Sequence, residues 1–226
     1  MLIVSSDDFA RLGHADDALR ALRPAQTATD LGALMRSGEA RMTQTDVVQV
    51  CYATRDIEAT ARTLAALEGV GPFFVTEFPL YDLVYRGDRV EYGPLQVAFG
   101  YSRDLQYELI RPPQGVASCY AEVLGDRREA LHHTFQPFRD DFDTVRARYE
   151  AAGEPVVYQG TAGDARIRFG FVDSRPRLGH FIELLETERM IGPEAMIYEL
   201  YGQIRAAAVD WSGQRPIRSM QELTGR

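Results

Sequence analysis

Hydrophobic and polar positions alternate at two different spacings along the chain, and the changes of spacing mark the predicted elements. Residues 47 to 52, Val-Val-Gln-Val-Cys-Tyr, are rich in β-branched and aromatic side chains, which favours a strand. A helix is then expected to start at Asp56 and to end at Gly69. Further short strands are predicted at 73 to 78, 81 to 85, 95 to 101 and 105 to 110, before Pro112-Pro113. This stretch therefore predicts one strand, one helix and three or four strands.

The same order of elements is predicted a second time further along the chain. After a connecting helix at 116 to 124, the pattern predicts a strand at 131 to 138, a helix at 141 to 152, and strands at 155 to 159, 166 to 173 and 181 to 186. At an offset of 84 positions, Arg55-Asp56 aligns with Arg139-Asp140, Thr60 with Thr144, Gly69 with Gly153, and Gln49 with His133. We therefore expect an α+β fold built from two tandem βαβββ modules that arose by duplication.

The two ends of the chain carry no chemical motif. Helix-like spacing of leucines predicts a helical N-terminal extension at 1 to 42, and a helix at about 194 to 209 is followed by a polar tail at 211 to 226. The predicted domains are thus the extension at 1 to 42, a first module at 43 to 115, a connecting helix with the second module at 116 to 190, and a C-terminal helix with its tail at 191 to 226. We expect a homodimer, in which the two terminal segments are candidate dimer elements.

Composition narrows the classes of function. The chain has 226 residues, a net charge of -8 and a pI near 5.1, which disfavours nucleic acid and anionic membranes as partners. All 25 basic residues are arginine, so a lysine Schiff base and a phosphate-loop lysine are excluded. The two cysteines match no zinc spacing and suit a reducing compartment. Neither a signal peptide nor a membrane span is evident, and a cytoplasmic location is expected.

Two of the four histidines occur together in the predicted strand that opens the second module. Strand alternation directs His133 and Phe135 to one face and His132 to the other. We therefore interpret His133 as a metal ligand, and His132 and His180 as packing or supporting residues. Replacing His133 should then abolish metal binding, whereas replacing His132 should leave the ion in place. Glu186 is expected on the opposite face from Glu183, in contact with solvent.

Two βαβββ modules with a polar residue on the first and last strand of each resemble the vicinal oxygen chelate superfamily, which includes glyoxalase I, methylmalonyl-CoA epimerase and the extradiol dioxygenases. The resemblance covers roughly residues 46 to 190. It implies that four residues bind one divalent metal ion at the mouth of a half-barrel: Gln49 in Val-Val-Gln-Val-Cys-Tyr, Glu108 in Tyr-Glu-Leu-Ile, His133 in Leu-His-His-Thr-Phe and Glu183 in His-Phe-Ile-Glu-Leu-Leu-Glu. One imidazole, one amide oxygen and two carboxylates suit Zn, Ni, Co, Mn or Fe better than Cu(I).

The ligand pattern is similar to that of eukaryotic glyoxalase I, and this similarity implies a lyase, isomerase or epimerase. In such an enzyme the metal would bind the oxygens of a small carbonyl substrate and stabilise an enediolate, while Glu183, with Glu108, moves a proton between adjacent carbons. No motif identifies the residues that grip glutathione in glyoxalase I, so the substrate stays open. Aromatic residues of the predicted strands are expected mostly in the core, with a subset lining a substrate pocket. Arg103 and Arg168 are candidates for meeting a substrate carboxylate.

Two other functions fit the same fold. One is a metal-free drug-binding protein of the bleomycin-resistance type, although such proteins typically lack the full ligand set. The other is an extradiol-type Fe(II) dioxygenase, which requires two histidines and a carboxylate as ligands. The sequence also leaves open whether the site forms within one chain or between two.

Overall fold

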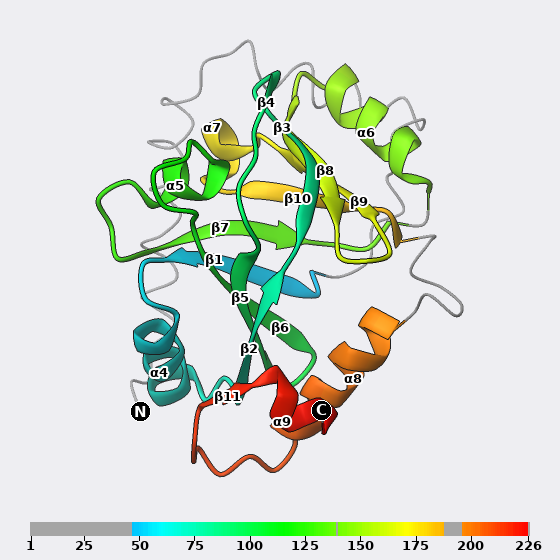
Figure 1. The fold of residues 1–226 in the computed structure, drawn as a ribbon. Helices are drawn as coiled ribbons and strands as arrows, with labels where there is room; N and C mark the ends of the chain where they lie inside the picture. The colour runs from blue at the N-terminus through cyan, green and yellow to red at the C-terminus, as the bar shows by residue number, and fades with distance from the viewer. Residues whose placement is uncertain (1–46, 139, 188–195, 226) are drawn as a thin grey trace, which may run out of the picture. The chain divides into compact units, whose positions relative to one another are not determined.

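The computed structural model describes residues 47–138, 140–187 and 196–225, so the predicted extension at 1 to 42 lies outside the described residues. The described part belongs to one compact unit (Figure 1). None of its helices combines the length and the apolar character that crossing a membrane requires. Its first half contains β1 (Gln49–Thr54), α4 (Ile57–Glu68), β2 (Phe73–Phe78), β3 (Leu80–Tyr85), β4 (Asp88–Arg89), β5 (Leu95–Ser102) and β6 (Leu105–Arg111).

The second half repeats this order of strands and its first helix, without the hairpin of β3 and β4 and with two further short helices, α5 (Cys119–Leu124) and α7 (Arg175–Leu178). It contains α5, β7 (Glu129–Phe135), α6 (Phe142–Ala151), β8 (Val156–Ala162), β9 (Ile167–Val172), α7 and β10 (Phe181–Leu185). The predicted strands and helices are present, with ends that differ by a few residues. The predicted domain boundaries stay a prediction, because the described strands all join one sheet.

Helix α4 shows how closely local sequence determines an element. Asp56 has an extended backbone, and its side chain accepts a hydrogen bond from the Ala59 backbone N–H at 3.0 Å. Gly69 ends the helix in the left-handed region, with φ of 67°, where its N–H donates to the Ala65 carbonyl. A side-chain acceptor at the start and a glycine at the end are the signals used in the sequence prediction. The predicted start and end of this helix are confirmed.

The described strands form an 11-stranded sheet in the order β11-β2-β5-β6-β1-β7-β10-β9-β8-β3-β4. Each half contributes a block in which the first strand pairs in parallel with the last, β1 with β6 and β7 with β10. The antiparallel pairing of β1 with β7 joins the two blocks in the centre. The predicted α+β fold with βαβββ modules is confirmed, and the sheet is curled without closing.

The β3–β4 hairpin is an addition to the first half. β3 follows β2 directly in the chain, yet it pairs with β8 of the second half rather than with a neighbour of β2. This insertion explains an asymmetry in the repeat. Gln49 and His133 are 84 positions apart, but Glu108 and Glu183 are only 75 apart, because the second half has no described hairpin at this place.

The C-terminal segment is part of the sheet and its cover. After α8 (Met196–Ala208), β11 (Ile217–Ser219) pairs in parallel with the edge of β2, and α9 (Met220–Thr224) follows (Figure 1). The sequence predicted a polar tail here and no further elements, so β11 and α9 are additions that the structure makes. The apolar face of α8 explains the packing, since Ile204 is fully buried and the Tyr201 ring lies 5.3 Å from that of Phe99 on β5. A role in dimer formation stays a prediction.

Candidate metal and active site

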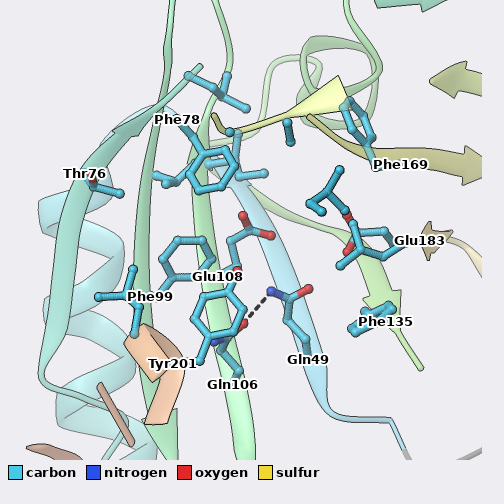
Figure 2. Close-up of a pocket in the computed structure, with 18 of the residues that line it drawn as sticks. Gln49, Thr76, Phe78, Phe99, Gln106, Glu108, Phe135, Phe169, Glu183 and Tyr201 are labelled. Carbon is cyan, nitrogen blue, oxygen red and sulfur yellow. Dashed lines mark hydrogen bonds between the residues drawn. The ribbon is translucent and has the colours of Figure 1, made fainter. Parts of the chain in front are cut away.

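The four predicted ligands converge on one cavity. Gln49, Glu108, His133 and Glu183 come from β1, β6, β7 and β10, which are neighbours in the centre of the sheet, and all four line a cavity of about 630 Å³. Figure 2 shows the side chains of Gln49, Glu108 and Glu183 directed into this space. The register explains the convergence, because Cys51 pairs with both Glu108 and His133, and Phe135 pairs with both Gln49 and Glu183. A single chain therefore supplies all four residues.

His133 lies between the two carboxylates. Its Nε2 atom is 3.4 Å from Glu108 Oε2 and 3.4 Å from Glu183 Oε2, and the imidazole is buried. Both separations are longer than a good N–H···O hydrogen bond. They fit donors that would share one cation, since two ligand atoms that each lie about 2.1 Å from an ion are roughly 3 to 3.5 Å apart. The spacing thus suits a shared ion better than a direct ion pair.

The amide of Gln49 is oriented by a hydrogen-bonded chain. Gln49 Nε2 donates to Gln106 Oε1 at 2.6 Å, and Gln106 Nε2 donates to the Tyr101 hydroxyl at 2.9 Å. Gln49 Oε1 is left buried without a partner, on the side of the amide away from Gln106 (Figure 2). A buried acceptor without a partner costs about 1–3 kcal/mol. Its place beside two carboxylates fits an oxygen held ready for a cation.

Gln106 was missed by the sequence reasoning. It lies two positions before Glu108 on β6, so the two side chains share one face of the sheet, and it pairs with Gln49 in the parallel register. The sequence signal that could have identified Gln106 is a glutamine on the same strand face as the proposed ligand Glu108. Its role depends on the pairing of two strands, which the sequence pattern alone did not specify.

Protonation of His133 is set by opposing effects. Burial alone would lower the pKa of its imidazole, but the carboxylates of Glu183 and Glu108 raise this pKa to about 9. Burial raises the pKa of Glu183, although the neighbouring His133 acts in the opposite direction. Without a cation, His133 therefore carries a proton between the two carboxylates at neutral pH. A divalent ion would have to displace that proton.

This competition predicts a pH-dependent affinity for metal. The displaced proton is bound below a pKa of about 9, so the apparent dissociation constant for Ni²⁺ should fall about tenfold per pH unit as the pH rises toward 9. Isothermal titration calorimetry between pH 6.5 and 8.5, in two buffers of different ionisation enthalpy, should report about one proton released per ion at pH 7. A constant affinity with no proton release would contradict protonation of His133 in the metal-free protein.

His132 does not face away from His133, and the prediction based on strand alternation is wrong. Cys51 pairs with His133 and Tyr52 with Leu131, so His132 is an extra residue in β7, at a β-bulge. The bulge interrupts the alternation and brings the two Nδ1 atoms to 2.8 Å. Both rings also pack against Phe171.

The contact between the two histidines can orient the proposed ligand. Burial lowers the pKa of His132, and the neighbouring His133 lowers it further, so the His132 imidazole stays neutral and its Nδ1 can accept a hydrogen bond. When His133 Nδ1–H donates to it, the lone pair of His133 Nε2 is directed toward the carboxylates. His132 therefore acts on the site through His133.

Replacing His132 with phenylalanine should keep a ring in this packed position but remove the acceptor. Partners of this kind typically change metal affinity about 10–100-fold, so we expect a loss of that size for Ni²⁺. His180→Phe is the matched control, because the His180 ring nitrogens lie near Leu178 and Thr134 outside the cavity lining. Titration calorimetry compares the two variants. Equal affinities would show that His132 only fills space.

A second group of potential ligands overlaps the first. The ligand atoms of Cys51, His132 and His133 lie within 4.8 Å of one another, and all three residues are buried. Burial raises the pKa of the Cys51 thiol, and the charges of Glu108 and Glu183 raise it further, so this sulfur is held in the neutral form that binds metals poorly. The two histidines also engage each other through Nδ1. The set with two carboxylates is the better cation site.

Glu186 pairs with Arg168 instead of facing solvent, and the partly exposed Arg168 side chain does not line the cavity. Glu186 is buried and accepts from Arg168 Nε at 2.8 Å, so the prediction that Glu186 meets solvent is wrong. Asp143 accepts from the same guanidinium at 3.0 Å. The cause is the pairing of β9 with β10, which places the residue after β10 beside Arg168. Arg103 lies in an exposed turn with φ of 56° and does not line the cavity.

Comparison with known proteins identifies the family. The family model described as Glyoxalase/Bleomycin resistance protein/Dioxygenase superfamily matches residues 48–171, which is more than half of the chain. The chain belongs to this superfamily. It is the vicinal oxygen chelate superfamily expected from the sequence. The match includes Gln49, Glu108 and His133, while Glu183 lies beyond it on β10.

Several solved structures are similar to this chain. Methylmalonyl-CoA epimerase from Mycobacterium tuberculosis has a TM-score of 0.48 and 20% identity, over 70% of this chain and 95% of that one. A hypothetical protein from Bacillus halodurans C-125 has a TM-score of 0.42 and 15% identity, over 62% and 92%. A Streptomyces coelicolor methylmalonyl-CoA epimerase variant with 2-nitronate-propionyl-CoA has a TM-score of 0.42 and 20% identity, over 63% and 94%. No curated protein sequence matches this chain.

Proposed function

We propose that this protein is a divalent-metal-dependent isomerase or epimerase that moves a proton on a carbon next to a carbonyl group. The observation that carries the proposal is the convergence of one imidazole, two carboxylates and one oriented amide oxygen in a single cavity. Membership of the superfamily supports it. Gln49, Glu108, His133 and Glu183 are the residues that would hold the ion.

The donor set fits an ion of the Zn, Ni, Co, Mn or Fe type, since it combines nitrogen with oxygen donors. When bound, such an ion supplies Lewis acidity that polarises a carbonyl and acidifies the adjacent C–H bond. Glu183 is the proposed base. A carboxylate of ordinary pKa is a weak base toward carbon, so Glu183 depends on a C–H bond that has been acidified in this way.

Glu108 is the candidate for returning the proton. It lies on the other flank of the His133 ring nitrogen, on β6 of the first half, whereas Glu183 lies on β10 of the second half. Two carboxylates on two sides of one carbon are what an epimerase needs, because removal and return of the proton then occur on opposite faces. The apolar cavity walls limit the access of water to the reacting carbon.

Metal analysis combined with proton exchange tests the proposal. We expect about one divalent ion per chain and metal-dependent uptake of deuterium next to the carbonyl, measured by NMR in heavy water with a panel of carbonyl compounds. The panel should include glutathione hemithioacetals, 2-substituted acyl-CoA esters and neutral hydroxyketones. The proposed function is wrong if none of Ni²⁺, Zn²⁺, Co²⁺ and Mn²⁺ binds to the protein and none of them raises its melting temperature.

A metal-free ligand-binding protein is the second candidate function, and the apolar character of the cavity favours it. Most of the residues that line the cavity are aliphatic or aromatic. Such a protein would bind ligand equally well after treatment with a chelator. An extradiol dioxygenase has less support, because the second histidine near the site is engaged with His133 through Nδ1. Oxygen uptake with catechols tests that activity.

Oligomeric state and location stay proposals. One chain contains the four ligand residues, so the site does not require a second copy. We retain a homodimer and a cytoplasmic location as expectations, and size-exclusion chromatography with light scattering tests the former. A small-molecule carbonyl compound is the proposed substrate, with no role for nucleic acid or membrane.

A further inference from the structure

Between the proposed metal ligands and the mouth, most of the cavity wall is apolar. Figure 2 shows the rings of Phe78, Phe99, Phe135, Phe169 and Tyr201 arranged around the polar end formed by Gln49, Glu108 and Glu183. Aliphatic side chains from several strands complete the lining: Leu80, Leu95, Val97, Ile110, Ile167 and Leu185. Burying apolar ligand surface against such walls removes it from water, which favours binding. Such walls favour a substrate with an apolar body and a polar end.

Part of the wall comes from segments outside the superfamily match. Leu200 and Tyr201 on α8 and Met220 on α9 line the cavity, although the matched region ends at residue 171. β11 holds this segment in place through its parallel pairing with β2. The C-terminal segment therefore adds apolar surface from beyond the region that the family model matches.

The mouth of the cavity is acidic. Glu77, Asp104 and Asp164 are exposed residues of the lining. Among the described lining residues, Arg205 is the one basic residue besides His133. Its guanidinium is paired with Asp104. The whole sequence contains no lysine. A cavity entrance with excess negative charge repels anions and slows their entry.

We propose that the site takes an uncharged, mainly apolar carbonyl compound, with an aromatic ring or a branched alkyl body, rather than a CoA thioester or a glutathione adduct. This inference rests on the proposed function in one respect: the carbonyl end of the substrate is taken to lie at the proposed metal ligands. A cavity of about 630 Å³ falls in the range of small-molecule sites. The phosphates of CoA and the carboxylates of glutathione would meet the acidic mouth without a free cationic partner among the described lining residues.

A matched pair of ligands tests the substrate class. Phenacyl alcohol is a neutral aromatic hydroxyketone, and its para-carboxylate has the same reacting end with one added negative charge. We expect the neutral probe to bind the Ni²⁺-loaded protein about tenfold more tightly than the anionic one, by titration calorimetry at low salt. Equal or tighter binding of the carboxylate would overturn the proposal, as would the absence of detectable binding by both probes at millimolar concentration.

Substitution of acidic residues at the mouth tests whether their charge causes the preference for the neutral probe. In the double variant Glu77→Gln with Asp164→Asn, affinity for the anionic probe should rise several-fold while affinity for phenacyl alcohol stays the same. The matched control, Asp126→Asn with Glu129→Gln, removes two exposed carboxylates that do not line the cavity, and it should change neither affinity. Equal effects of the two double variants would show that net charge, and not the acidic mouth, sets the preference.

The proposed substrate class and the proposed function can fail independently of each other. Bound metal and deuterium exchange report the chemistry, whereas the ratio of the two probe affinities reports the cavity. If the protein binds no metal, the proposed function fails, and the same probe ratio measured on the metal-free protein still decides the ligand class. If metal binds and the anionic probe is preferred, the substrate class is wrong and the proposed chemistry stands.

Discussion

Replacing His133 with glutamine or alanine is expected to lower affinity for Ni²⁺ by a thousandfold or more, on the order expected when a direct ligand rather than a supporting residue is lost. His133 is the imidazole that lies within 3.4 Å of both carboxylates. Without it, Glu108 and Glu183 repel each other in a buried place, and leaving buried charge uncompensated costs about 3–5 kcal/mol. Calorimetric titration with Ni²⁺ measures the loss.

The His133 variants need a check of folding, because that cost in stability is large. Circular dichroism and the melting temperature separate loss of the site from loss of the fold, and the glutamine variant keeps a polar side chain in the position. Thr134→Ala is the matched control on the same strand, since Thr134 is a neighbour that does not line the cavity. A folded His133→Gln protein that retains wild-type affinity for Ni²⁺ would remove His133 from the site.

For the enantiomer that Glu183 deprotonates, Glu183→Gln is expected to lower the rate of proton exchange by about 10²–10⁴-fold, the contribution typical of a positioned general base. The amide can still offer an oxygen donor, so bound metal should fall much less than the exchange rate. The measurement is deuterium uptake next to the carbonyl by NMR, normalised to bound metal. Full exchange in this variant would exclude Glu183 as the base.

Glu108→Gln complements that experiment. If Glu108 returns the proton on the opposite face of the carbon, exchange should be lost from one enantiomer in this variant and from the other in Glu183→Gln. Glu186→Gln is the control, because Glu186 lies just after β10 and pairs with Arg168 outside the cavity lining. Its exchange rate per folded molecule should match that of the wild type.

The parts of the fold that can be predicted from the sequence are those determined by residues close together in the chain. The Asp56 cap, the Gly69 stop and the β-branched run of β1 act over a few residues, so their physical cause can be read directly from the order of residue types. The two copies of one order of elements then predicted a duplicated βαβββ module. The resemblance to the vicinal oxygen chelate superfamily implied that Gln49, Glu108, His133 and Glu183 form one site, and all four line the cavity.

The missed features all depend on strand pairing between distant segments. The bulge at His132 exists because β1 and β7 pair out of step at one residue, and alternation within β7 could not reveal it. The role of Gln106 follows from its register with Gln49. The burial of Glu186 follows from the pairing of β9 with β10, which supplies Arg168 as its partner. None of these partners is near in the sequence.

The sequence by itself determined the α+β class and the duplicated order of elements, and its resemblance to a known superfamily indicated the four candidate ligands. The tertiary structure decided how those residues are supported and what surrounds them. It placed β11 on the edge of β2 and the hairpin of β3 beside β8, although the tail reads as polar and the hairpin follows β2 in the chain. Local patterns report which face of a strand is apolar, whereas the partner of that face is selected by packing over the whole chain.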